Sequence, residues 1–499
     1  MAERDAPLEM DAAAFREAGH ALVDRIAAFL ESLPSRTVTR GEAPADVRRL
    51  LPEDRLPDRG RAAKELLEEA SALLFDHSLF NGHPRFWGYI TSSAAPIGAL
   101  ADLLAAAVNP NCGAWVLSPA ATEIEAQTIR WIAELIGYPR DCGGLLVSGG
   151  NMGNMVGFVA ARRARVPWDV RALGVAGSDE RLAVYASKEA HTWVQKATDL
   201  FGLGTAAIRW IDTDARQAML PAALEAAIAA DVRDGRIPLL VVGTAGSVST
   251  GAIDPLREIG AICRRLGIWL HVDGAYGAFA AALPEAPADL KALSDADSVA
   301  LDPHKWLYAP LEAGCALVRD PRHLSDAFGY HPAYYAFHGE GAGASASASA
   351  PLNYYELGPQ NSRGFRALKV WLGLRQAGRE GYVRMIRDDI ALATALDAVV
   401  RKHAELEAMS LSLSIATFRY VPAGLPGRAD TAGYLDDLNR AIVERLQSGG
   451  EAFVSNAVVD GKQALRACVV NFRTTRADVE ALPEIVARIG RAVDRERRP

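Results

Sequence analysis

Stripes of apolar residues at three- and four-residue steps mark two segments near the start of the chain. Residues 15–33 carry one stripe and residues 62–75 carry another, with a connector rich in Pro and Arg around Pro52 and Pro57 between them. This spacing predicts two amphipathic helices. A helix with a single apolar face cannot bury that face alone, so we expect both helices to pack on another domain or on another subunit.

The pattern changes between about residues 96 and 378, where short apolar runs alternate with helical segments. The runs are 182–187, 238–246, 268–276 and 297–302, and helical spacing is seen in segments such as 256–267. Strands that are apolar along their whole length and separated by helices indicate a parallel sheet covered on both faces. Ligands bind at the carboxyl ends of such strands, so the polar residues directly after these runs are the candidates for a site.

A small α+β domain is predicted at the end of the chain. Spacing predicts a helix over 364–378, strands over 411–422 and 467–475, and helices over 435–447 and 482–493. The stretch 339–351 consists largely of Gly, Ala and Ser, and it is either a surface linker or a flap over a site. We therefore predict three domains: a helical arm over 1–95, a large α/β domain over 96–380 and a small α+β domain over 381–499.

Composition excludes several classes of protein. The 499 residues are 50% hydrophobic and 23% charged, which are ordinary globular fractions and exclude a disordered or collagen-like chain. The net charge of −7 argues against a nucleic-acid partner. No apolar run is long enough to span a membrane, and no signal peptide is visible. The five scattered cysteines favour reduced thiols over disulfides or a metal site, so we expect a cytoplasmic protein without a bound metal.

Two charged residues directly follow predicted strands. Lys305 lies in Asp302-Pro303-His304-Lys305-Trp306, after the run 297–302. A buried lysine has a lowered pKa and can form a Schiff base, but a structural or phosphate-binding lysine is equally compatible with this position. Asp273 lies near the end of the run 268–276, at the expected end of the strand, where a carboxylate can contact a ligand, cap a helix or bind a metal.

Two further segments complete a chemical set. A glycine-rich turn at 148–154 precedes a helix and is either an anion site of backbone amides or a simple tight turn. His191 is either a ligand-stacking residue or a cap. A lysine for a Schiff base, a carboxylate for a ring nitrogen, a glycine turn for a phosphate and a histidine for stacking are what pyridoxal 5'-phosphate (PLP) requires.

The ordered motifs resemble the PLP-dependent group II amino-acid decarboxylases, which act on aromatic amino acids, glutamate, cysteine sulfinate or diaminobutyrate. The resemblance covers most of the chain and rests on the segments 83–86, 118–125, 148–154, 271–276, 302–306, 362–371 and 471–475. It implies the fold of the aspartate aminotransferase-like PLP enzymes (fold type I), with 96–380 as the PLP-binding domain. It also implies a homodimer whose active site lies at the interface, with the N-terminal arm on the partner.

The resemblance also implies residue roles. Lys305 matches the lysine that holds PLP and His304 precedes it as in the family, Asp273 matches the partner of the ring nitrogen, and His191 matches the stacked histidine. Gly150 and Asn151 fall in the phosphate-binding turn. Asp302 stands where many members have asparagine, and its negative charge conflicts with a phosphate contact. Ser247 stands where relatives often carry a threonine, so a hydroxyl contact with phosphate is expected there.

The remaining implied roles concern the proton donor and the substrate. The segment 331–334 resembles the family's mobile loop, with Tyr334 as the donor that protonates the α-carbon, which favours simple decarboxylation over aldehyde formation. The substrate side chain is expected near Trp87, Tyr89, Ile90 and Ser92. Because three of these residues are largely apolar, we expect an aromatic L-amino acid. The alternatives are an acidic or diamino acid, an aldehyde-forming enzyme or aminotransferase, and a PLP-binding dimer without activity.

Overall fold

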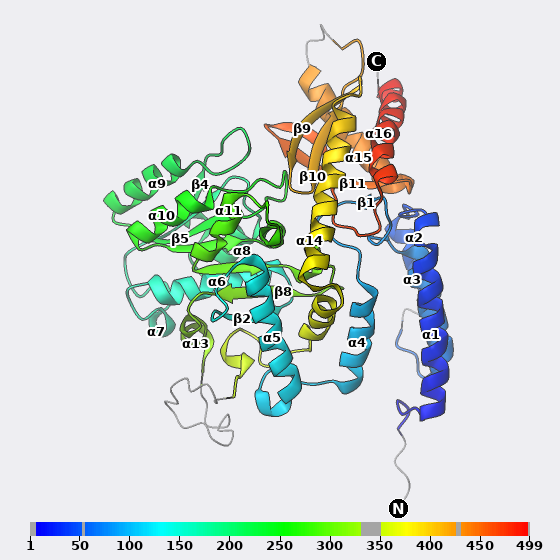
Figure 1. The fold of residues 1–499 in the computed structure, drawn as a ribbon, viewed down its shortest axis with the longest axis horizontal. Helices are drawn as coiled ribbons and strands as arrows, with labels where there is room; N and C mark the ends of the chain where they lie inside the picture. The colour runs from blue at the N-terminus through cyan, green and yellow to red at the C-terminus, as the bar shows by residue number, and fades with distance from the viewer. Residues whose placement is uncertain (1–5, 52–54, 331–350, 426–430, 498–499) are drawn as a thin grey trace, which may run out of the picture.

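A seven-stranded sheet forms the centre of the protein (Figure 1). The computed structural model describes residues 6–51, 55–330, 351–425 and 431–497. The strand order is β2-β8-β7-β6-β5-β3-β4, and the strands are β2 (Gly143–Val147), β3 (Leu182–Ser187), β4 (Ile208–Ile211), β5 (Ile237–Thr244), β6 (Trp269–Asp273), β7 (Ser298–Leu301) and β8 (Gly314–Val318). The strands from β4 to β7 pair in parallel, whereas β8 is antiparallel to both neighbours. The mostly parallel sheet predicted from the sequence is confirmed.

Helices cover both faces of this sheet and therefore bury its strands on both sides. On β6, His271 contacts Asn154 of one helix, α6. The next residue, Val272, lies beside Gly243, which faces Leu256 of another helix, α10. The helices of this region are α4 (Pro96–Val108), α5 (Pro119–Ile136), α6 (Gly150–Arg165), α7 (Val170–Leu173), α8 (Trp193–Leu200), α9 (Pro221–Arg233), α10 (Leu256–Leu266), α11 (Ala288–Lys291), α12 (Pro303–Trp306), α13 (Arg322–Phe328) and α14 (Ala367–Val400), with short 3-10 turns at Leu33–Ser35, Trp115–Leu117, Thr205–Ala207, Gly277–Ala282, Ala292–Asp295 and Tyr354–Glu356.

A five-stranded sheet lies above the first in Figure 1 and contains most of the C-terminal segment. Its order is β1-β11-β12-β10-β9, and its elements are β1 (Phe86–Trp87), β9 (Leu406–Ser412), β10 (Ile415–Tyr420), β11 (Phe453–Val459) and β12 (Lys462–Cys468), with helices α15 (Thr431–Gly449) and α16 (Arg476–Arg497). β1 pairs in parallel with β11 and therefore joins the predicted arm to this sheet. The boundaries of the three domains stay a prediction.

Two strand predictions in this sheet were wrong. The segment 411–422 is not one strand, because Leu413 adopts φ +50° and turns the chain between β9 and β10. The predicted strand 467–475 shares only its first two residues with β12, and β11 was not predicted. Hairpin turns of this kind depend on single backbone angles that apolar spacing does not reveal.

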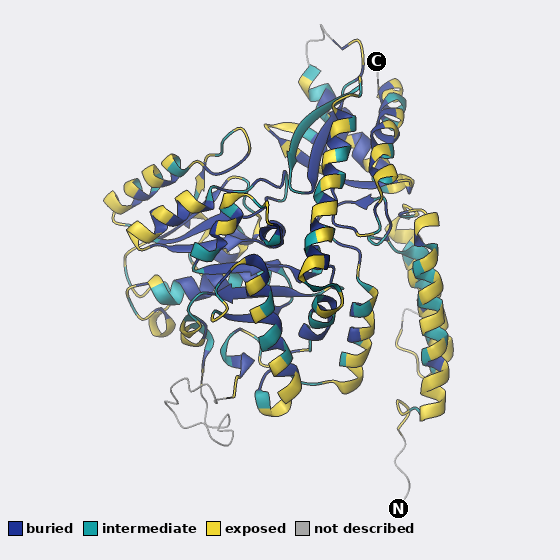
Figure 2. Cartoon of the chain, in the orientation of Figure 1, coloured by how far each residue is buried: buried dark blue, intermediate teal, exposed yellow. Residues whose placement is uncertain are grey.

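The two predicted N-terminal helices are present as α1 (Ala12–Ser32) and α3 (Ala63–His77), with the short α2 (Pro44–Arg49) between them. Asp11 begins α1 by accepting hydrogen bonds from the N–H groups of Ala13 and Ala14. The rings of Phe29 and Phe75 stack at 4.4 Å and join the helices. Ala18 is nevertheless the one residue of α1 that is buried, and Figure 2 shows α1 largely exposed.

Among the described residues, no helix combines the length and apolar character needed to cross a membrane. The segment 339–351, read from the sequence as a linker or a flap, falls outside the described residues except for Pro351.

Candidate active site

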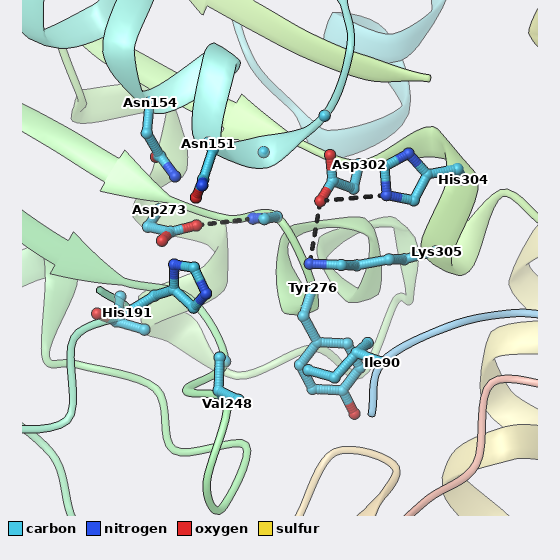
Figure 3. A pocket seen from close by; sticks show the side chains of 15 residues that line it. Ile90, Asn151, Asn154, His191, Val248, Asp273, Tyr276, Asp302, His304 and Lys305 are labelled. Atoms are coloured by element: carbon cyan, nitrogen blue, oxygen red, sulfur yellow. Dashed lines mark hydrogen bonds and ion pairs between the residues drawn. The ribbon is translucent and has the colours of Figure 1, made fainter. Parts of the chain in front are cut away.

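One cavity of about 320 Å³ opens where the carboxyl ends of β5, β6 and β7 meet the start of α6 (Figure 3). Its size lies in the range of small-molecule sites. The lining residues are Ile90, Gly149, Gly150, Asn151, Asn154, His191, Thr244, Gly246, Val248, Asp273, Ala275, Tyr276, Asp302, His304 and Lys305. Eight of the predicted site residues therefore share one cavity.

Asp273 is the last residue of β6 and presents its carboxylate to this cavity. Trp193 donates its indole N–H to Oδ2 at 2.8 Å, and the backbone N–H of Ala275 donates to Oδ1 at 3.2 Å. Burial raises the pKa of the Asp273 carboxyl, and the positive charge of Lys305 opposes that shift. A buried carboxylate held in this way is suited to stabilise a cationic ring nitrogen.

Lys305 enters the cavity from α12, the short helix that follows β7. Its Nζ lies 3.0 Å from Oδ2 of Asp302. The next residue, Trp306, donates its indole N–H to Asp389 of α14 at 2.9 Å and stacks on Tyr276 at 4.8 Å. The main chain that carries the Lys305 amine is therefore anchored on two sides.

Asp302 lies between this amine and the glycine-rich turn. A Cβ atom added at Gly150 would lie 2.8 Å from Oδ2 of Asp302. The same oxygen lies 3.6 Å from Nε2 of His304, whose Nδ1 accepts the backbone N–H of Ala313 at 3.0 Å. The other oxygen, Oδ1, is buried and finds no hydrogen-bond partner among the described residues. Asp302 thus forms an ion pair with Lys305 at the edge of the glycine-rich turn.

The glycine-rich turn provides free backbone donors at the start of α6. Gly149 has φ +147°, and no side chain within the described chain caps the helix. Gly150 and Asn151 are the first helical residues and line the cavity. Uncapped N–H groups at the N-terminus of a 16-residue helix favour an anion.

His191 lies at the open side of the cavity, just before α8. Its Nδ1 accepts the backbone N–H of Trp193 at 3.3 Å. Desolvation lowers the pKa of the His191 imidazole, which favours the neutral ring. A neutral imidazole whose Nδ1 is held by a backbone hydrogen bond is suited to stack on a planar ligand.

Comparison with known proteins decides the family. Residues 44–421 match the profile described as the pyridoxal-dependent decarboxylase conserved domain. The chain belongs to this family. It is 32% identical over 473 residues to the aromatic-L-amino-acid decarboxylase of Bacillus atrophaeus, covering 95% of this chain and 94% of that protein.

Solved structures agree with the family at the level of the fold. The crystal structure of Oryza sativa TDC with PLP and tryptamine matches this decarboxylase with a TM-score of 0.88 and 29% identity, over 98% of this chain and 99% of that one. The structure of Catharanthus roseus tryptophan decarboxylase in complex with L-tryptophan matches with a TM-score of 0.86 and 26% identity, over 98% and 100% of the chains. The decarboxylase therefore has the PLP fold type I, as the sequence indicated.

The residues of the cavity fit PLP. One cavity of suitable size holds three kinds of group: the amine of Lys305, the buried carboxylate of Asp273 and the uncapped N–H groups at the start of α6. These are the groups needed to bond an aldehyde, to pair with a ring nitrogen and to bind a phosphate.

One predicted cofactor contact of the decarboxylase does not fit the structure. The hydroxyl of Ser247 lies 3.1 Å from the hydroxyl of Thr250 and accepts the backbone N–H groups of Thr250 and Ala252. These bonds belong to the turn that follows β5. Ser247 does not line the cavity, whereas its neighbours Gly246 and Val248 do.

Only Ile90 of the predicted substrate residues lines the cavity. The indole of Trp87 is buried in the core of the small sheet, where it donates to Thr474 at 3.2 Å, and does not line the cavity. Tyr89 is 57% exposed and lies outside the lining set, with its backbone N–H bonded to Ser455.

Ser92 lies outside the cavity lining and supports the main chain of a neighbouring segment. Its buried hydroxyl donates to the backbone carbonyl of His304 at 2.8 Å and so supports the segment that carries Lys305. Tyr334, the predicted proton donor, lies outside the described residues.

Sequence reasoning missed Trp193 and Asn154. Trp193 holds Asp273, and Asn154 lines the cavity one helical turn after Gly150. The spacing of four residues within the helix after the glycine turn was a usable signal for Asn154, because it places both residues on one face. No comparable signal pointed to Trp193.

Proposed function

We propose that this decarboxylase converts an aromatic L-amino acid to its amine and carbon dioxide. The observation that carries the substrate class is the charge of the cavity. Among the described lining residues, Lys305 is the only lysine or arginine, and it already faces Asp302. A substrate with a second carboxylate would find no cation to pair with, which is costly in a desolvated site. Ile90, Val248 and Tyr276 offer apolar surface instead.

The same observation bears on the aminotransferase alternative. Aminotransferases usually bind the substrate carboxylate with an arginine, and no arginine is found among the described residues that line the cavity. Decarboxylation instead requires that the carboxylate be free to leave and that its bond stand perpendicular to the cofactor ring.

The roles of the site residues follow from their chemistry. Bound PLP supplies an aldehyde that bonds amines and a ring that withdraws electrons from the α-carbon. The Lys305 amine would hold the cofactor through its aldehyde, and the carboxylate of Asp273 would pair with the ring nitrogen. His191 limits tilting of the ring, and Gly150 and Asn151 bind the phosphate through their backbone. Tyr334 is proposed as the donor of the proton to the α-carbon, on the sequence motif alone.

The substrate class is tested with the holoenzyme and a matched panel of amino acids. We expect release of carbon dioxide and amine from phenylalanine, tyrosine, tryptophan, DOPA or 5-hydroxytryptophan. The best of these should exceed glutamate, aspartate, cysteine sulfinate and diaminobutyrate in kcat/KM by about 100-fold, the scale of an unpaired charge in a desolvated pocket. Hydrogen peroxide and aldehyde, measured in parallel, should stay at trace levels. An acidic or diamino acid that matches the best aromatic substrate contradicts the proposal.

We further propose that the protein is a homodimer in the cytoplasm. Leu100, Leu103 and Leu104 on α4 are each more than half exposed, and Phe15 of α1 and Leu74 of α3 are 60% exposed. Apolar surface on this scale is typical of a surface covered by a partner. The cytoplasm is supported by the cysteines, since all five are unpaired thiols.

A double substitution on α4 tests the dimer. Leu103→Glu with Leu104→Glu places two carboxylates in the proposed interface of each subunit, so we expect the dimer to dissociate about 100-fold more readily and activity to fall with it. Sedimentation velocity over a range of concentrations measures the change. Leu173→Glu is the control, because Leu173 is 58% exposed but lies on α7, away from α4 in Figure 1. A dimer as tight as the wild type in the double variant contradicts this interface.

A further inference from the structure

A chain of buried hydrogen bonds lies beneath the carboxylate of Asp273. Trp269, His271 and Asp273 alternate along β6 and therefore point to the same face of the sheet. The indole Nε1 of Trp269 lies 2.8 Å from the hydroxyl of Ser298 on β7, and that hydroxyl lies 2.8 Å from Nδ1 of His271. Nε2 of His271 lies 2.7 Å from Oδ1 of Asn154 on α6. The chain ends at a residue that lines the cavity.

The direction of each bond follows from the donors. An indole N–H can only donate, so Ser298 accepts from Trp269. The amide oxygen of Asn154 can only accept, so Nε2 of His271 donates to it and Nδ1 accepts the proton of the Ser298 hydroxyl. Complete burial lowers the pKa of His271 to about 3, so the ring is neutral and carries one proton. That proton is on Nε2 and is donated to Oδ1 of Asn154. The Asn154 amide is therefore fixed with its oxygen toward His271 and its NH₂ group turned away.

The NH₂ group of Asn154 is left without an acceptor. Asn154 is 1% exposed, and no described residue accepts a hydrogen bond from its Nδ2. Figure 3 shows Asn154 beside Asn151, next to Asp273, on the wall that α6 forms. An amide donor that has no protein partner and borders a ligand cavity is free to bond a ligand, so its position points to a ligand acceptor.

A glycine on α6 permits this arrangement. A Cβ atom added at Gly157 would lie 2.6 Å from Nδ1 of His271 and 3.0 Å from the hydroxyl of Ser298. A larger residue would push α6 away from β6 and lengthen the bond between His271 and Asn154. The close approach and the bond are therefore linked.

We propose that Asn154 donates a hydrogen bond to bound PLP and that His271 is the positioning residue that orients the Asn154 amide. The inference rests on the cofactor of this family and not on the class of substrate. It adds to the site a donor from within α6, one turn below the backbone amides of the glycine-rich turn.

The test is the affinity of the apoenzyme for PLP, measured by quenching of tryptophan fluorescence without substrate. Asn154→Asp keeps the shape of the side chain but replaces the NH₂ donor with a negative oxygen near Asp273, so we expect the Kd for PLP to rise at least about tenfold. Asn154→Ala, which only removes atoms, should raise it severalfold. Asn456→Asp on the exposed part of β11 adds the same charge at a residue that does not line the cavity and should leave the Kd unchanged.

The role of His271 is tested by loss and rescue. His271→Leu removes the donor to Asn154 and should weaken PLP binding severalfold, whereas His271→Gln can place an amide N–H near the position of Nε2 and should restore most of the affinity. Thermal unfolding of each apoenzyme, followed by circular dichroism, establishes that the variants are folded.

Folded Asn154→Asp and Asn154→Ala variants that bind PLP within twofold of the wild type overturn the donor role of Asn154. Equal weakening by His271→Leu and His271→Gln overturns the positioning role. Because no amino acid is present, these outcomes are independent of whether the substrate is aromatic.

Discussion

Lys305→Ala should abolish decarboxylation and remove the visible absorption band of the purified protein. The Lys305 amine is the only primary amine of a lysine among the described residues that line the cavity. Without this amine the protein cannot bind the cofactor covalently, and the cofactor is not held in position for reaction with the substrate amine. The loss in kcat should therefore exceed about 1,000-fold, the scale associated with losing an oriented reacting group. Steady-state release of carbon dioxide and the visible spectrum measure both effects.

Lys462→Ala is the control for this substitution. Lys462 lies on β12 with a half-exposed side chain 3.9 Å from Glu407, so its loss should change neither the spectrum nor the turnover. A Lys305→Ala protein that keeps the visible band would assign the cofactor to another lysine.

Asp273→Asn should lower kcat by about 100- to 1,000-fold, the scale of removing one electrostatic contact from a preorganised site. The change keeps the shape of the side chain and removes its charge. The buried carboxylate, held by Trp193 and Ala275, is the group that stabilises a protonated ring nitrogen, and a neutral amide cannot do so. The measurements are kcat for the best substrate and the position of the absorption band.

Trp193→Phe is the matched variant for Asp273. It removes one donor to Oδ2 but leaves the negative charge in place, so we expect a loss of less than about tenfold. If Asp273→Asn and Trp193→Phe lose activity equally, the charge of Asp273 is not the property that matters.

The part of the site at the strand ends was predictable from the sequence. Asp273 ends one fully buried strand and Lys305 lies shortly after another, and parallel strands bring their carboxyl ends to one edge of the sheet. Glycines before a helix likewise predicted the uncapped start of α6. These inferences needed only local patterns.

Two predicted site residues, Trp87 and Ser247, lie outside the cavity lining for two different reasons. Trp87 packs in the small sheet because β1 pairs with β11, more than 360 residues later. The hydroxyl of Ser247 accepts hydrogen bonds from backbone N–H groups of its own turn, and apolar spacing does not reveal such bonds. The position of Trp87 therefore depends on a distant strand, and that of Ser247 on the conformation of its own turn.

Two segments that carried the family resemblance have a structural explanation. Glu125 of 118–125 and Arg363 of 362–371 form a fully buried ion pair, and Arg363 also donates to the carbonyl groups of Cys112 and Leu146. A buried charge persists only with such partners. This pair joins α5, the end of β2 and the segment before α14, so these motifs support the cavity without lining it.

The most direct test of the account is to locate the cofactor on the chain. Reduction of the holoenzyme with borohydride fixes PLP to the amine that holds it, and proteolysis with mass spectrometry identifies the labelled peptide. We expect a single labelled lysine, Lys305, in the peptide that contains Asp302 and His304. A label on any other lysine, or a protein that takes up no PLP, would contradict it.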